Sequence, residues 1–178
     1  MNTNIVRLAI ISDTHGYIDP HVVEVIRRCD QVLHAGDICG AHVLEQLHQL
    51  KSQVTAVAGN NDAAGLWPIE ATEVVNALPK IARLQLPGGE LVVEHGHLHG
   101  MQQPDHASLR LTHPQARVIV YGHTHCMLVD KENTPWVVNP GAAGATRTNG
   151  GASCLILTAS ASKEWDVEML RFPLDEIA

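Results

Sequence analysis

The sequence has few aromatic side chains and no long apolar run, and both absences narrow what the protein can be. Phe, Trp and Tyr make up 3% of its 178 residues, so a core has to be built from Val, Ile, Leu and Ala. No apolar stretch approaches the roughly 20 residues of a membrane-spanning helix. The N-terminus also lacks a positively charged segment followed by an apolar one, so we expect no signal peptide and a cytoplasmic location.

Cysteine is scarce, and the basic residues form no run. The four cysteines are widely spaced without a C-x-x-C motif, which favours reduced, buried thiols over disulfides or a zinc knot. The formal net charge is −7, so there is no strong signal for binding nucleic acid. A metal site could still attract phosphate locally.

What is present is typical of one globular domain. Apolar residues make up 45% of the chain and charged residues 17%. A chain of this length can bury a large enough apolar core to fold without disulfides or structural metal ions. Because no linker, repeat or low-complexity tract divides the chain, we expect a single domain over residues 1–178.

The first sixty residues alternate between strand and helix patterns. Apolar, β-prone runs predict strands over 5–11, 31–34 and 54–58. Residues 19–29 begin with Asp-Pro, which is typical of a helix start, and the apolar spacing over 43–50 indicates a second, amphipathic helix. This β-α-β-α-β order implies a parallel sheet with right-handed crossovers.

The second half is richer in strands and is predicted to form a series of hairpins. Its expected strands are 80–86 with 90–94, 126–130 with 135–138, 153–158 with 165–172, and a further strand at 117–121. We therefore predict an α/β fold in which two sheets face each other with helices outside, the second half being largely antiparallel.

Asp, His and Asn side chains follow several of these apolar runs. This happens at five places: Asp13-Thr14-His15, Gly36-Asp37, Gly59-Asn60-Asn61-Asp62, His95-Gly96-His97 and Gly122-His123-Thr124-His125. The carboxyl edge of an α/β sheet is where chemistry is usually placed. Packing alone hardly explains five such strand ends, so we expect them to meet in one region.

The types of these residues point to metal ions. Mixed oxygen and nitrogen donors suit Mn²⁺, Fe²⁺, Co²⁺, Ni²⁺ or Zn²⁺ better than Mg²⁺ or Ca²⁺. The candidate ligands are Asp13, His15, Asp37, Asn60, His95, His123 and His125. Seven side chains are too many for one ion but suit two ions that share a carboxylate, an arrangement that catalyses in-line displacement at phosphorus.

Taken in order, the five motifs resemble the signature series of calcineurin-like metallophosphoesterases. The resemblance is to the small bacterial and archaeal phosphodiesterase branch, related to the retromer scaffold subunit, and extends from residue 5 to about residue 150. It implies a two-sheet β-sandwich flanked by helices, in four αββα layers. It also implies a binuclear, metal-dependent phosphodiesterase in which a metal-bridging hydroxide attacks a small phosphate ester in line.

The same resemblance divides the ligands between two divalent ions per chain. The first ion would be held by Asp13, His15, Asp37 and His125, and the second by Asp37, Asn60, His95 and His123. Mn²⁺ ranks first, with Ni²⁺, Co²⁺, Fe²⁺ and Zn²⁺ as alternatives. The resemblance also suggests dimers or larger assemblies, for which residues 66–69 could supply an apolar contact unless they pack internally.

Asn61 departs from the larger phosphatases of the superfamily, which carry at this place a histidine thought to assist the leaving group. An amide can hydrogen-bond to a phosphoryl oxygen but cannot act as an acid, so we expect weaker action on substrates with poor leaving groups. Asp62, which orients that histidine in the family pattern, is expected here to fix the loop. His97 could donate a hydrogen bond to the phosphate or only support the ligands.

Two alternative functions stay open. A metal-poor protein-interaction scaffold, like the retromer relative, is one, and the pattern of that relative replaces His15 with another residue. A phosphomonoesterase or protein phosphatase is the other, although such enzymes usually carry histidine where Asn61 stands.

The other polar residues have plainer interpretations. His34 is expected to pack in the core, and Arg147 could either reach a substrate phosphate or stay solvated. Five histidines fall in polar or amphipathic stretches and are expected to be solvated: His21, His42, His48, His106 and His113.

Overall fold

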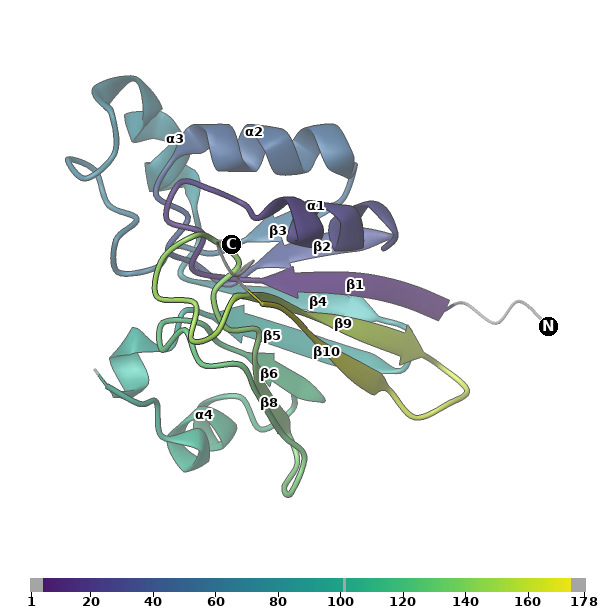
Figure 1. Cartoon of the computed structure of the whole chain (residues 1–178). Helices are drawn as coiled ribbons and strands as arrows, with labels where there is room; N and C mark the ends of the chain where they lie inside the picture. Colours follow the sequence, from purple (N-terminus) through teal and green to yellow (C-terminus); the bar gives the residue numbers. More distant parts are fainter. Residues whose placement is uncertain (1–4, 101, 174–178) are drawn as a thin grey trace.

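The computed structural model describes residues 5–100 and 102–173, in which two five-stranded sheets are packed face to face (Figure 1). The first sheet contains β1 (Ile5–Ile11), β2 (Gln31–His34), β3 (Val54–Ala56), β9 (Ala152–Ser160) and β10 (Asp166–Phe172). The second contains β4 (Ile81–Leu86), β5 (Gly89–Glu94), β6 (Val118–Val120), β7 (Leu128–Asp130) and β8 (Trp136–Asn139). The strand orders are β10-β9-β1-β2-β3 and β4-β5-β6-β8-β7.

The helices begin and end at residues that the local sequence explains. They are α1 (Pro20–Arg27), α2 (Ala41–Leu50), α3 (Thr72–Ala77) and α4 (His106–Thr112), with 3₁₀ turns η1 (Ile69–Ala71) and η2 (His97–His99). Asp19 caps α1 by accepting a hydrogen bond from the backbone N–H of His21 at 2.8 Å, and Pro20 occupies the first helical position. The helix ends at Arg27, two residues before the predicted end.

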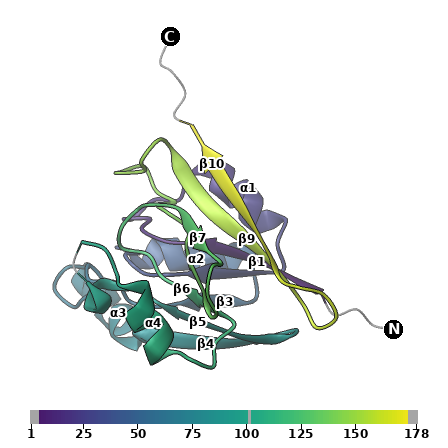
Figure 2. The ribbon, with the colours of Figure 1, turned by 90° about the horizontal axis from the view of Figure 1, so that it is seen from below.

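Three apolar clusters join these elements into four layers. Because side chains alternate across a strand, Ile10 of β1 packs toward Val93 of the second sheet, while Ile11 packs toward Val22 of α1. On the opposite face of the second sheet, Leu109 of α4 lies in a third cluster. Figures 1 and 2 accordingly show α1 and α2 beside the first sheet and α4 beside the second. The predicted αββα architecture is confirmed.

The centre of the second sheet differs from the hairpin prediction. The β4–β5 and β7–β8 pairs are antiparallel as expected, but β6 pairs parallel with both β5 and β8. The connection from β5 to β6 includes α4, in a stretch for which the sequence predicted no helix. Parallel neighbours need such a crossover, so sequence-adjacent strands alone do not reveal them.

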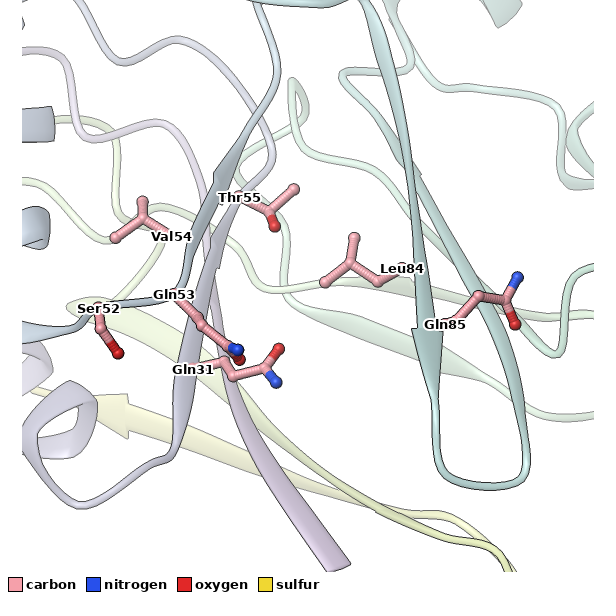
Figure 3. A pocket seen from close by; sticks show the side chains of 7 residues that line it. All are labelled: Gln31, Ser52, Gln53, Val54, Thr55, Leu84 and Gln85. Atoms are coloured by element: carbon pink, nitrogen blue, oxygen red, sulfur yellow. The ribbon is translucent and has the colours of Figure 1, made fainter.

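The opposite end of the sandwich carries a polar cavity of about 370 Å³ between the edge strands β3 and β4 (Figure 3). Its lining residues are Gln31, Ser52, Gln53, Val54, Thr55, Leu84 and Gln85. None of them is an acid or a histidine, so this cavity offers hydrogen bonds but no charged metal ligand. Within residues 5–100 and 102–173, no helix is long and apolar enough to cross a membrane.

Candidate metal centre

The predicted ligands lie where five strands end, on one edge shared by both sheets (Figure 1, left). The first sheet contributes Asp13 after β1, Asp37 after β2 and Asn60 after β3. The second sheet contributes His95 after β5, and His123 and His125 after β6. The prediction that these strand ends meet is thus confirmed as geometry, because contacts between side chains of the two sheets connect them.

The first group of side chains surrounds the Nε2 atom of His15. This atom lies 3.2 Å from Nε2 of His125 and 3.8 Å from Oδ2 of Asp37. Oδ1 of Asp13 is buried, accepts no hydrogen bond from the described residues and lies 3.2 Å from Nε2 of His125. A divalent cation would satisfy this orphaned oxygen and both imidazole nitrogens at once, so the group fits a metal ion.

The second group gathers on the other side of Asp37. Oδ1 of Asp37 lies 3.3 Å from Nε2 of His95, and Oδ1 of Asn60 lies 3.2 Å from the same nitrogen. Nδ1 of His123 approaches Oδ1 of Asn60 to 2.9 Å. Asp37 therefore belongs to both groups, as expected of a carboxylate that bridges two ions.

Neighbouring groups orient several of these ligands. Nδ1 of His95 lies 2.7 Å from the carbonyl oxygen of Ala35 and donates to it, which leaves Nε2 to face Asp37. Asn61 donates twice to Asp37, from its backbone N–H at 2.9 Å and from its side-chain amide at 2.6 Å. The backbone N–H of His123 donates to Oδ2 of Asp13 at 3.0 Å.

Electrostatics in the site favour a cation. Burial opposes ionisation of Asp37, but hydrogen bonds from His95 and Asn61 outweigh it and hold its pKa well below the ordinary range. Burial likewise opposes protonation of His95, yet the hydrogen bond to Asp37 raises its pKa. Burial lowers the pKa of His15 despite the nearby carboxylates, which leaves this ring neutral and able to ligate at neutral pH.

Five of the seven candidate ligands have a backbone conformation that the sequence did not predict. Their φ angles are positive, namely 52° at Asp13, 47° at His15, 55° at Asp37, 68° at His123 and 57° at His125. Such conformations cost non-glycine residues of order 1–3 kcal/mol each and cluster at functional sites. Only the neighbouring glycines hinted at them. Gly59 is needed for another reason, since a Cβ there would overlap the carboxylate of Asp37.

The other predicted site residues lie beside the ligands. The ring of His97 is 5.5 Å from that of His95 and 6.1 Å from that of His123, between centroids. Its Nδ1 atom is buried and makes no hydrogen bond within the described chain. Burial, and then the two neighbouring histidines, lower the pKa of His97, so it is neutral at pH 7.

Asp62 fixes the loop, as predicted. Its carboxylate accepts hydrogen bonds from the backbone N–H groups of Ile38, Cys39 and Gly59 at 2.8–3.1 Å. The indole N–H of Trp67 donates to it at 3.2 Å. These donors tie the loop after β3 to the loop after β2, and so hold Asn61 against Asp37.

The histidine predictions have mixed outcomes. His34 is buried as expected, and its ring lies 2.9 Å from the hydroxyl of Thr14. The prediction that His106 and His113 are solvated is wrong: Asp130 binds the first at 2.8 Å, and buried Glu94 binds the second at 3.2 Å. Glu94 was missed altogether, although it stands directly before a candidate ligand.

The two packed sheets, with Asp, Asn and His side chains gathered at a common edge, agree with the comparison to protein families. The family model for the calcineurin-like phosphoesterase superfamily domain matches residues 6–162, and the chain belongs to this superfamily.

Two relatives support this assignment at the level of sequence. The chain is 30% identical over 166 residues to the probable metallophosphoesterase YsnB of Bacillus subtilis, covering 92% of this chain and 88% of that one. It is 24% identical over 144 residues to phosphodiesterase MJ0936 of Methanocaldococcus jannaschii, covering 76% and 82%.

A solved structure supports the assignment at the level of fold. Vacuolar protein sorting 29 from Cryptosporidium parvum superposes with a TM-score of 0.74 at 20% identity, covering 96% of this chain and 99% of that one. At this level of identity the likeness shows the fold alone.

Proposed function

We propose that the protein is a phosphodiesterase that depends on two divalent metal ions. One observation carries the proposal: Asp37 approaches both His15, at 3.8 Å, and His95, at 3.3 Å. The Asp and His side chains also form two overlapping clusters that could each hold an ion, Asp13 with His15 and His125, and Asp13 with Asp37 and His95. Asp13, His15, Asp37 and His125 would hold the first ion. Asp37, Asn60, His95 and His123 would hold the second.

The donors indicate the class of metal ion, and Mn²⁺ is our first choice within that class. Four imidazoles, two carboxylates and one amide suit a mid-row divalent ion, with Mn²⁺ ahead of Ni²⁺, Co²⁺, Fe²⁺ and Zn²⁺. When bound, such ions supply a water nucleophile at neutral pH and offset negative charge on the phosphoryl oxygens.

The protein's own groups would act on the substrate by hydrogen bonding. The side-chain amide of Asn61 is held beside Asp37, where it can turn toward a phosphoryl oxygen without giving up a proton. His97 is neutral and adjoins His95 and His123, so it can donate one hydrogen bond to the phosphate. Without an acid at position 61, the site favours small phosphodiesters with good leaving groups over monoesters.

The name of the archaeal phosphodiesterase relative supports this choice of substrate class. A cytoplasmic location and one domain over the whole chain belong to the same proposal. All four cysteines are free thiols, a state that suits a reducing compartment.

A second candidate is an interaction scaffold, which the fold likeness to vacuolar protein sorting 29 favours. The residues proposed for an apolar contact, 66–69, differ in their exposure. Trp67 is 5% exposed and packs internally, while Leu66 and Ile69 are 65% and 83% exposed. The exposed pair could contact a protein partner or a second copy of this chain. The filled set of ligands, His15 included, favours the enzyme.

A metal-dependence assay tests the proposal. The protein is stripped with a chelator, and hydrolysis of a chromogenic phosphodiester and its matching monoester is followed with Mn²⁺, Ni²⁺, Co²⁺, Zn²⁺ or Mg²⁺ restored singly. We expect diester turnover with mid-row ions and its loss in His15→Ala. No turnover with any ion, despite two ions bound per chain, would contradict the proposal and favour the scaffold.

A further inference from the structure

Arg147 reaches into the candidate metal centre from the loop between β8 and β9. Its Nη2 atom lies 3.0 Å from Nε2 of His15. A guanidinium has only donors, so the imidazole nitrogen must be the acceptor in this hydrogen bond. The lone pair of His15 Nε2 is therefore directed at Arg147.

The same lone pair is the one that a metal ion would use. Nε2 of His15 faces Nε2 of His125 at 3.2 Å and Oδ2 of Asp37 at 3.8 Å. The other ring nitrogen, Nδ1, points away from these groups and lies 3.5 Å from the thiol sulfur of Cys39. An imidazole nitrogen has one lone pair, so an ion and Arg147 cannot both take it.

The loop that carries Arg147 is tied down on both sides of the residue. The amide of Asn149 donates to the carbonyl oxygen of His125 at 3.0 Å, and Arg171 donates to the carbonyl oxygens of Thr148 and Asn149. The backbone at Arg147 is held at a φ of 52°. An exchange of partners would consequently move the side chain while the backbone stays beside the site.

If a metal ion displaced the guanidinium of Arg147 from His15, the guanidinium would lie beside two cations. An anion bound there would offset this accumulation of positive charge. Arginine binds phosphate through paired, charge-assisted hydrogen bonds, and a phosphate ester seated on the ions would present its oxygens there. Arg147 would also supply positive charge that Asn61 cannot.

We propose that Arg147 competes with a metal ion for Nε2 of His15, and that it donates to the substrate phosphate when the ion holds that nitrogen. This inference rests on the proposed phosphoesterase function. It makes Arg147 a residue that opposes metal binding yet favours substrate binding, so its removal should shift the two affinities in opposite directions.

The test measures both affinities by calorimetry. Mn²⁺ is titrated into the chelator-stripped protein, and inorganic phosphate into the Mn²⁺-loaded protein, for the wild type, Arg147→Ala and Arg147→Lys. In Arg147→Ala we expect Mn²⁺ to bind about 2- to 10-fold more tightly, since a competing hydrogen bond is lost. We expect phosphate to bind about 10- to 100-fold more weakly, with a matching rise in KM for the diester.

Two variants serve as comparisons. Arg27→Ala removes the same charge from an exposed side chain of α1 that forms an ion pair with Glu24 at 3.3 Å, and it should shift neither affinity. Arg147→Lys keeps the charge but loses the paired geometry, so its phosphate affinity should fall between those of the wild type and Arg147→Ala.

The outcomes separate this inference from the proposed function. Weaker or unchanged Mn²⁺ binding in Arg147→Ala, or unchanged phosphate binding, would overturn the exchange even if the wild type hydrolyses diesters. Opposite shifts of the two affinities would support it even if no tested diester is hydrolysed, in which case only the proposed function fails.

Discussion

The two halves of the metal centre are built differently. The closed half is the part around His95 and Asp37, which are 0% and 3% exposed; His95 donates to the carbonyl oxygen of Ala35, and Asn61 donates to Asp37. The open half is defined by His15 itself, whose side chain is 16% exposed and contacts Arg147 on a surface loop, while its neighbours Asp13 and His125 are buried. Asn60, beside His95, is exposed as well. The closed half thus fixes geometry, while the open half can exchange partners with a substrate.

The largest effect should come from Asp37, which joins the two halves. Asp37→Asn removes the shared negative charge, so we expect diester turnover to fall at least about a thousandfold, corresponding to about 4 kcal/mol of lost transition-state stabilisation. Metal analysis should find fewer than two ions per chain. Asp166→Asn, an exposed change in β10, is the matched control. Two bound ions and normal turnover in Asp37→Asn would show that the halves do not share this residue.

Substitution of one histidine in each half should have a smaller effect on turnover, and the effect on stability should distinguish the two halves. His15→Ala and His95→Ala should each lower turnover about a hundredfold or more, because each removes a metal ligand. Only His95→Ala should also destabilise the metal-free protein, by about 2 kcal/mol, since it leaves a cavity and an unpaired carbonyl. In thermal unfolding this is a Tm lower by about 4–8 °C for a chain of this size. Equal Tm values for both variants would remove the distinction between a closed and an open half.

The two carboxylates of the centre were the ligands most predictable from sequence. Asp13 and Asp37 follow apolar runs that form the central parallel strands β1 and β2, and such strands align their carboxyl ends whatever the rest of the chain does. The start of α1 was equally predictable, because its signals, Asp19 and Pro20, lie at the beginning of the helix itself.

What sequence reasoning missed depends on contacts between distant residues. The three residues of β6, Val118–Val120, carry no signal for a parallel partner, and the pairing of Glu94 with His113 depends on where α4 lies. The positive φ angles of the ligands are imposed by the surrounding fold, since such angles are uncommon for any non-glycine residue, although Asp and His adopt them more readily than most. The approach of Arg147 to His15 spans 132 residues and has no local signature.

A substitution at position 61 tests whether an acid placed at the boundary of the two halves can assist the leaving group. Asn61→His places an acid beside Asp37, and we expect monoester turnover to rise about tenfold, below the about 10²–10⁴-fold of a well-positioned acid. Diester turnover with a good leaving group should change little. Asn76→His, on the exposed side of α3, controls for the added histidine. If monoester turnover does not rise, this position does not control leaving-group assistance.

The smallest effect is expected at the opposite end of the sandwich, where the cavity of Figure 3 provides the sharpest contrast with both halves. Gln53→Ala and Gln85→Ala remove polar groups from a cavity without acids or histidines, so turnover should stay within about twofold of the wild type. Stability should change by no more than about 0.5 kcal/mol, as is usual for surface positions. Turnover of the diester and Tm, measured side by side, check both values. A tenfold loss of turnover with an unchanged Tm would mean that substrate recognition extends beyond the carboxyl edge of the sheets, and the comparison of the two halves would then describe only part of the site.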